Sequence, residues 1–457
     1  MNHFRVLWNT TPFRDQLKVL LLDLYVAWAT DPELSIGISM SVSAWDTSSR
    51  YNALHLSKVM IQLVRRLAEV GLIDLAKGSY SGPGHPRNRV TRIRAYGDLV
   101  DLFAEARFEL HDVIHSPDRE TIILRNDDGA DGRSKPVEYD DTADTNRMRE
   151  ELRAYNALLA DTFIDIRDLD RPFVERDITT GPRAGTVQRV PIGPTNAFVR
   201  RVFSRGRWDL NGRFYGGWWQ QIDRERRNLI CLDRTPTVEV DYKGLHVAIL
   251  AAGKGVPVTG DPYLVPPGIV DGIDEQQQRD ILKMLVLTAL NAASTKAAYR
   301  AFRDGFPAGS RAKSLKDTEL ERFLAAFTDR HPYLADALGT DQGIRLMYRD
   351  SQIAERIINH FTERGMPVLC IHDSFIIDHR YSDKLRTCME NVALELFEMT
   401  FAVSQDYAGI DQFLSNPDNS LETYVHHRDF PPYSAGFNHR AEEFRKRKRR
   451  EERRNSR

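Results

Sequence analysis

The chain has 457 residues, enough for two or three domains, and 41% of them are hydrophobic, which is typical of a globular protein with a buried core. No apolar run approaches the roughly 20 residues of a membrane span, and the first residues lack the pattern of an export signal, so we expect a cytoplasmic protein without a membrane partner. The formal net charge is −1, so whole-chain charge does not indicate nucleic acid, and three widely spaced cysteines exclude a disulfide framework.

Residues 1–110 are expected to form helices followed by a short hairpin. Apolar residues recur at helical spacing over 59–70, and Gly71 is placed to end that helix. Two β-prone runs, 72–76 and 90–96, flank a loop rich in Gly, Pro and Arg. This order resembles a winged helix-turn-helix DNA-binding domain, and a protein-binding module of the same shape is the alternative. In the first case, DNA phosphates would be contacted by Lys77, Arg87, Arg89, Arg92 and Arg94.

The rest of the chain divides by composition. Residues 111–145 are polar, acidic and contain Gly, which is typical of a linker or an exposed loop. A helix and a hairpin are expected within 146–197, and helices and strands alternate in an α+β pattern over 198–435. The last segment, 436–457, is strongly basic; we expect a disordered tail that either holds phosphate or is simply a solvated end.

Two aspartates are candidates for chemistry. Asp241 ends a β-prone run and precedes an apolar segment expected to be helical, although an Asp at this position also serves as a helix cap. Asp373 lies between two apolar runs, 368–371 and 375–377, which predict a tight hairpin within a core sheet. A charge at the tip of such a hairpin costs free energy unless it is solvated or used, so the second position is the stronger indication.

Between the two aspartates, a helix is expected over 274–305. Arg279, Lys283, Leu287 and Asn291 follow one another at a spacing of four residues and therefore share a face of that helix. A solvated basic edge would show the same pattern. Alternatively, the two cations bind a triphosphate while the apolar and polar residues meet the base and the sugar.

Together the three segments resemble motifs A, B and C of the family A polymerases, including the single-subunit bacteriophage RNA polymerases. The matching residues are Asp241-Tyr242 for motif A, Arg279 and Lys283 for motif B, and His372-Asp373-Ser374-Phe375 for motif C. The HDSF form of motif C is similar to that of the phage RNA polymerases. Upstream, the segment 208–215 (WDLNGRFY) resembles the Asp-x-x-Gly-Arg-x-Tyr signature of the same enzymes. The matches cover roughly 209–378, under half of the chain.

The resemblance implies a right-hand polymerase palm with small fingers, in which 146–197 would be thumb-like. It also implies template-directed nucleotidyl transfer with two Mg²⁺ ions, for which Mn²⁺ can substitute, held by Asp241 and Asp373. The other implied roles are phosphate binding by Arg279 and Lys283, nucleotide contacts by Tyr242, His246, Leu287 and Asn291, and nucleic-acid contacts by Arg213, Tyr215 and His372.

Two positions depart from the family pattern. His246 stands five residues past Asp241, where the DNA enzymes carry a Glu that excludes ribose, and Asn291 stands where motif B has a Tyr. The choice between NTP and dNTP therefore stays open. Imidazole can hydrogen-bond a 2′-hydroxyl and Asn leaves space beside it, so we expect NTPs to be accepted at least as well as dNTPs.

We therefore expect an RNA polymerase or primase-like enzyme that acts on a DNA template in the replication or priming of a mobile element or phage. A primer-extending DNA polymerase is the nearest alternative. An inactive palm within a winged-helix DNA-binding regulator is another, against which the retained aspartates and motif B cations count. A metal-dependent nuclease is a third, against which the basic helix counts, because it suits a triphosphate.

Overall fold

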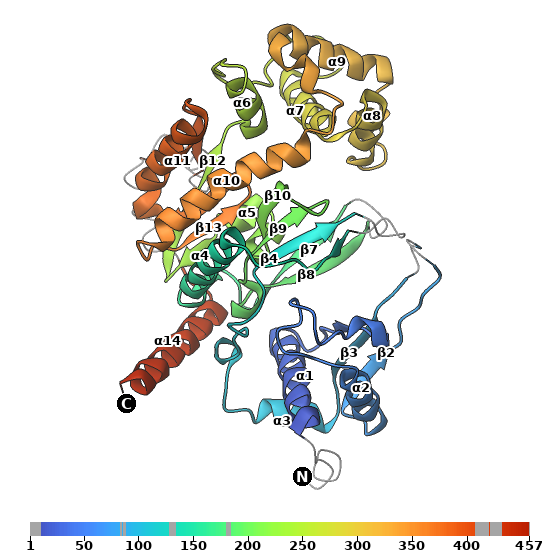
Figure 1. Cartoon of the computed structure of the whole chain (residues 1–457), viewed down its shortest axis with the longest axis vertical. Coiled ribbons are helices and arrows are strands. Elements are labelled where there is room, and N and C mark those ends of the chain that lie inside the picture. Colours follow the sequence, from blue (N-terminus) through green and yellow to red (C-terminus); the bar gives the residue numbers. More distant parts are fainter. Residues whose placement is uncertain are drawn as a thin grey trace.

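The structure, a computed structural model, shows an α+β protein with a small N-terminal domain, central sheets and a group of helices on the far side of these sheets (Figure 1). None of the helices in the described part of the chain is long and apolar enough to cross a lipid bilayer. The described residues are 11–82, 85, 88–127, 134–179, 184–406, 420 and 432–456.

The N-terminal domain has its own hydrophobic core. Its elements are α1 (Thr11–Thr30), β1 (Ile36–Ile38), α2 (Val59–Glu69), β2 (Ile73–Ala76), β3 (Thr91–Ala95) and α3 (Asp98–Ala104). The strands form an antiparallel sheet in the order β1-β3-β2, and Leu63 and Leu67 of α2 are buried in one cluster with Ile93 of β3. Gly71 follows α2 with a φ of 72°, as expected of a residue that ends a helix. The predicted order of helix, strand, loop and strand is present, while a DNA-binding winged helix stays a prediction.

Residues 111–145 differ from the expected linker. They contain β4 (Ile122–Asn126), which pairs in parallel with β9 (Arg200–Ser204) in a sheet of order β10-β9-β4-β5, completed by β5 (Lys135–Pro136) and β10 (Arg207–Tyr215). Ile122 is fully buried, because it packs with Leu124 of the same strand in the main hydrophobic core. The polar composition around the run concealed it.

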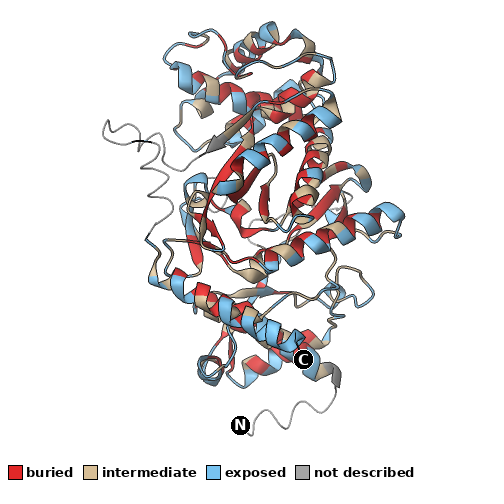
Figure 2. Ribbon diagram, turned by 90° about the vertical axis from the view of Figure 1, so that its left-hand side faces the viewer, coloured by how far each residue is buried: buried red, intermediate tan, exposed pale blue. Residues whose placement is uncertain are grey.

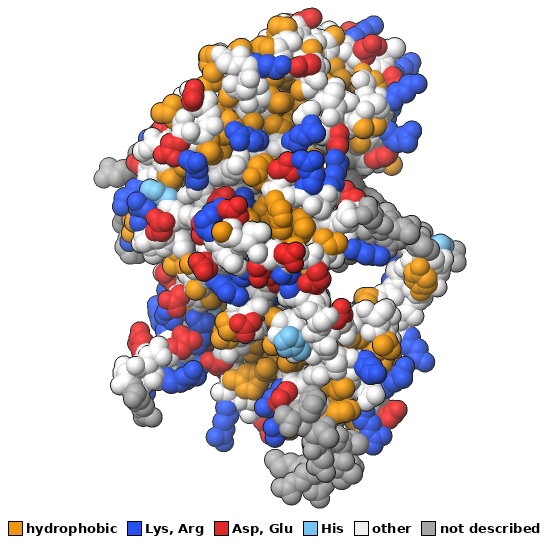
Figure 3. Space-filling view, viewed as in Figure 1, with side chains coloured by type: hydrophobic (Ala, Val, Ile, Leu, Met, Phe, Trp, Pro, Cys, Tyr) orange, Lys and Arg blue, Asp and Glu red, His pale blue; other side chains and the backbone are white. Residues whose placement is uncertain are grey.

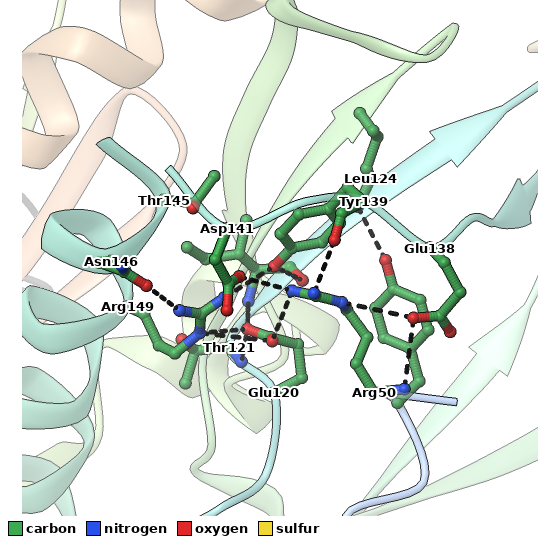
Figure 4. Close-up of polar contacts among 12 residues, drawn as sticks. Arg50, Glu120, Thr121, Leu124, Glu138, Tyr139, Asp141, Thr145, Asn146 and Arg149 are labelled. Atoms are coloured by element: carbon green, nitrogen blue, oxygen red, sulfur yellow. Dashed lines mark hydrogen bonds and ion pairs between the residues drawn. The ribbon is translucent and has the colours of Figure 1, made fainter. Parts of the chain in front are cut away.

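A cluster of charges attaches this segment to the N-terminal domain (Figure 4). Arg50, from the loop before α2, donates to the Tyr139 carbonyl oxygen at 2.6 Å and to the Asp141 carboxylate at 3.0 Å, and its Nε lies 3.4 Å from Glu138. Its guanidinium also lies 3.6 Å from the centre of the Tyr139 ring. These contacts, from one arginine, hold the two parts of the chain together through partly buried ion pairs.

The expected helix and hairpin are both present. They are α4 (Ala143–Ala160), whose N-terminus is capped by Thr142, and the antiparallel pair β7 (Phe173–Ile178) and β8 (Thr186–Pro191). Helix α4 contacts β4 and α10 (Gly343–Thr362), so it packs directly on the central part of the molecule. Its role as a thumb stays a prediction.

The sheet that carries the candidate site has the strand order β13-β14-β12-β11-β6, and β15 pairs with the end of β12. Its strands are β6 (Ile164–Ile166), β11 (Ile230–Leu232), β12 (Thr235–Tyr242), β13 (Val368–Ile371), β14 (Ser374–Asp378) and β15 (Val403–Asp406). Within the described residues, all strand pairings in this sheet are antiparallel. The strands predicted before Asp241 and on both sides of Asp373 are therefore confirmed.

The segment expected as one helix over 274–305 is two helices, α7 (Glu275–Asn291) and α8 (Thr295–Asp304). Ala292 is extended and Ser294 caps the second helix by accepting a hydrogen bond from the Ala297 amide at 3.3 Å, so the chain turns there. With α9 (Asp317–Arg330) they form the group of helices opposite the N-terminal domain (Figure 1). Further helices are α5 (Arg224–Arg227), α6 (Leu245–Ala252) and α11 (Ser382–Phe397). Short 3₁₀ helices lie at Val42–Ala44, Leu110–Asp112, Pro194–Asn196, Trp218–Gln221, Ala312–Ser314, Pro332–Ala337 and His379–Tyr381.

The expectation of a disordered basic tail is wrong for most of its length. Residues Ala435–Asn455 form a helix, α14, that is buried along one side and exposed along the other (Figure 2). Phe437 and Phe444 pack with Phe163, and Arg440 donates to both carboxylate oxygens of Asp165 at 2.7 and 2.9 Å. Apolar residues recur at helical spacing within the basic run, and they anchor the helix to the sheet.

We predict that Phe437→Ala destabilises the whole protein, because this side chain is fully buried. The free energy of unfolding should fall by about 3–5 kcal/mol, as for other buried Phe residues that are truncated. Denaturant unfolding measures it, with the exposed Lys446→Ala in the same helix as the control. Equal effects of the two variants would show that α14 is not anchored as the structure has it.

Candidate active site

The two candidate aspartates lie at the same end of two neighbouring strands. In the pairing of β12 with β14, Asp241 stands opposite Ser374, the residue that follows Asp373. The Tyr242 amide donates to the Asp373 carbonyl oxygen at 3.3 Å. His372 and Asp373 form the turn between β13 and β14, and His372 takes a φ of 54° there. This strand pairing therefore brings Asp241 and Asp373, which are 132 positions apart in sequence, into one site.

Asp241 and Asp373 line a cavity of about 850 Å³ between the end of the sheet and α7. The cavity is also bordered by α6, the 260–263 turn and the start of α5. Most of the predicted site residues meet here although four separate segments supply them. They are Arg213, Asp241, Tyr242, His246, Arg279, Lys283, Leu287, Asn291, His372 and Asp373.

Burial and like charge act together on Asp241 at this end of the sheet. Burial, followed by the nearby carboxylates of Asp373 and Glu239, raises the pKa of Asp241 to about 7, while Lys283 and Arg224 act in the opposite direction. An acid in this setting is stabilised in its charged form by any cation that enters the cavity. The site is therefore suited to a bound cation.

The wall formed by α7 supplies positive charge. Lys283 is exposed and forms no ion pair with any described residue, so its charge is available to a ligand. Arg279 is engaged: its Nε donates to Asp261 at 2.6 Å and another nitrogen donates to Asp280 at 2.9 Å. Leu287 and Asn291 continue the same face, as their spacing predicted.

A buried charge that the sequence analysis missed lies behind two of the residues that line the cavity, Arg213 and His246. Asp350 of α10 is 1% exposed; Arg213 donates to both of its carboxylate oxygens, and the His246 Nε2 lies 3.0 Å from one of them. Asp350 could have been found, because it interrupts the apolar face of a helix formed by Leu346, Ile353 and Ile357. Arg213 and His246 are thereby fixed by α10 rather than free in the cavity.

A third carboxylate, Glu239, was also missed. Both of its oxygens accept from Arg227, at 2.9 and 3.1 Å, and one of them accepts from the Ser374 hydroxyl at 2.6 Å. The alternation of β12 carries the signal, because Glu239 and Asp241 are two residues apart and so share a face of the strand.

Two predicted contacts take a different form. Tyr242 borders the cavity, but its side chain is buried and its hydroxyl donates to the Met389 carbonyl oxygen at 2.6 Å. This hydroxyl is therefore not available to a nucleotide, because it anchors the strand to α11. Tyr215 is not among the residues that line the cavity. Its ring packs edge-on against the His372 ring, with the two ring centroids 5.2 Å apart, and so supports the turn.

The predicted cations of the N-terminal domain lie apart from this cavity. Lys77, Arg89 and Arg92 are exposed, and Figure 3 shows Lys and Arg side chains on this part of the surface, beside β2. Arg94 instead pairs with Asp74 and Glu33. Arg87 lies outside the described residues. DNA contacts by these cations stay a prediction.

The residues at this end of the sheet fit a magnesium site in which the protein supplies only one or two carboxylate ligands. Within the described residues, no three His, Cys, Asp or Glu side chains are grouped so as to hold a metal ion. Mg²⁺ commonly takes one or two carboxylates and keeps water or substrate phosphates as its other ligands. Asp241 and Asp373, at adjacent strand ends beside an open cavity, meet that requirement.

Comparisons with known proteins add little to this geometry. No protein-family model and no curated protein matches the chain. Among solved structures, the chain is similar to the POL domain of Pol1 from M. smegmatis, in complex with a DNA primer-template and dNTP. The identity is 13% and the TM-score 0.27, over 45% of this chain and 47% of that one. The match thus spans less than half of either protein and decides neither family nor activity.

We predict that Arg213→Ala lowers the free energy of unfolding by about 3 kcal/mol, because it removes the main partner of the buried Asp350 carboxylate. The control is Arg207→Ala in the same strand, which removes an exposed pair with Asp209 and should change little. Denaturant unfolding of the two variants compares them. A similar small loss in both would contradict the buried network.

Proposed function

We propose that the chain is a template-directed nucleotidyltransferase of the RNA polymerase or primase type. The observation that carries this is one cavity with Asp241 and Asp373 at the ends of paired strands and Lys283 on the facing helix. Carboxylates that suit divalent cations and a cation that suits phosphates are what a metal-dependent reaction of a nucleoside triphosphate needs. The order of these residues in sequence, similar to motifs A, B and C of family A polymerases, supports the same reaction.

The reaction is an in-line displacement in which a hydroxyl oxygen attacks the α-phosphorus of a nucleoside triphosphate and pyrophosphate leaves. Asp241 and Asp373 would hold two Mg²⁺ or Mn²⁺ ions, which when bound stabilise the attacking and leaving oxygens. Lys283 would offset the charge of the β- and γ-phosphates. Arg279 would do so once it exchanges Asp261 for phosphate, and His372, packed against Tyr215, would contact the primer or product end.

The proposed setting is the replication or priming of a mobile element or phage. This setting is supported by the contacts of Arg50, which attach the N-terminal domain, with its basic loop, to the part of the chain that carries the cavity. If that domain binds duplex DNA as proposed, the attachment would deliver a DNA template to the enzyme in one chain.

We predict that Asp241→Asn and Asp373→Asn each abolish nucleotide incorporation while the protein stays folded. The reason is that each removes a charge that a divalent cation requires, without changing side-chain size. The measurement is incorporation of NTPs or dNTPs on a DNA template in Mg²⁺, once with a primer and once without it. The control is Asp329→Asn, which changes an exposed aspartate.

Near-normal activity of either variant would refute the assignment of the two carboxylates. The same assay separates the other functions. Degradation of the template without incorporation indicates a nuclease, primer-dependent use of dNTPs alone indicates a DNA polymerase, and binding without any reaction indicates an inactive palm.

A second prediction concerns the sugar. The Nε2 of His246 is held by Asp350 and the ring borders the cavity, so we expect wild type to accept NTPs at least as well as dNTPs. His246→Glu should shift the preference toward dNTPs, because the family A DNA polymerases carry at this position a Glu that excludes ribose. Incorporation of one matched NTP or dNTP measures this, with His246→Gln as the uncharged control. A wild-type preference for dNTPs that the substitution leaves unchanged would contradict it.

A further inference from the structure

Glu239 is a buried carboxylate whose contacts reach both parts of the proposed metal site. It is 8% exposed and stands two residues before Asp241 on the same face of β12. One of its oxygens accepts from Ser374, the residue directly after Asp373, and both accept from Arg227 of α5.

The geometry makes Glu239 a support rather than a ligand. Its two oxygens are already occupied by a bidentate arginine and a hydroxyl, which leaves little capacity for a cation. Its charge nevertheless acts on Asp241, whose pKa it raises. The bond to Ser374 meanwhile holds the first residue of β14, and with it the turn that carries Asp373.

We propose that Glu239 is a positioning residue of the divalent-metal site, which orients the Asp373 turn through Ser374 and adds negative charge beside Asp241. The inference rests on the proposed function, in which Asp241 and Asp373 hold the metal. Arg227 donates to both Glu239 oxygens and so fixes the carboxylate in the orientation in which one oxygen also accepts from the Ser374 hydroxyl. Residues behind the ligands of a metal site commonly change metal affinity by about 10–100-fold when they are replaced.

Two substitutions separate the two effects. Glu239→Gln keeps an oxygen that can accept from Ser374 but removes the charge, whereas Ser374→Ala keeps the charge but removes the hydrogen bond. Asp165→Asn is the matched control, because it also weakens a buried bidentate pair with an arginine, Arg440, at a place remote from the cavity. A purely structural role would make Glu239→Gln behave like this control.

The experiment titrates the full-length protein with Mn²⁺ alone, without nucleotide or nucleic acid, and measures binding by electron paramagnetic resonance or calorimetry. Thermal unfolding checks that each variant is folded. We expect Glu239→Gln to bind Mn²⁺ about ten-fold more weakly than wild type, Ser374→Ala to be weakened as well, and Asp165→Asn to stay within two-fold. If Glu239→Gln does not fold, Ser374→Ala, which loses only a hydroxyl, still tests the positioning.

The inference is overturned if the folded Glu239 and Ser374 variants bind Mn²⁺ within two-fold of wild type while Asp241→Asn loses binding; the proposed function would survive that result. If wild type shows no Mn²⁺ binding that Asp241→Asn and Asp373→Asn remove, the metal site and this inference both fail. Weakening in the Glu239 and Ser374 variants, but not in Asp165→Asn, supports the inference.

Discussion

The pairing of β12 with β14 is the constraint on which the candidate site depends. It places Asp241 and Asp373 side by side at one end of a buried sheet, where burial and the nearby charge of Asp373 raise the pKa of Asp241. Folding does not favour such an arrangement by itself, because repulsion and lost hydration oppose it. The strands are nevertheless held in register by a hydrophobic core that includes Val240 and Phe375, both fully buried.

The surroundings of the two aspartates can be understood as responses to this repulsion. Arg227 pairs with the third acid, Glu239, and so offsets part of the negative charge that this carboxylate adds beside Asp241. Lys283 faces the cavity from α7 and lowers the pKa of Asp241. Helix α10 carries Asp350, which binds Arg213 and His246 and so fixes both side chains at the edge of the cavity.

Much of this was within reach of the sequence because it depends on neighbours along the chain. Alternation and apolar runs predicted β12, β13 and β14, and a repeat of four predicted the face of α7. The same local patterns, in the right order, indicated motifs that bring Asp241, Lys283 and Asp373 together. Composition was a poorer guide: it hid the buried strand β4 in a polar segment and the apolar anchor of α14 in a basic one.

By itself, then, the sequence determined the strands that carry Asp241 and Asp373, the face of α7 and the order of these segments, because they follow from local spacing and side-chain type. Only the tertiary structure decided their partners. Asp350 and Glu239 join the site through residues more than 100 positions away, Arg213 and Ser374, and Arg279 is engaged by Asp261 from a turn. Such pairings depend on how helices pack on sheets, and no local pattern encodes which buried charge meets which counter-ion.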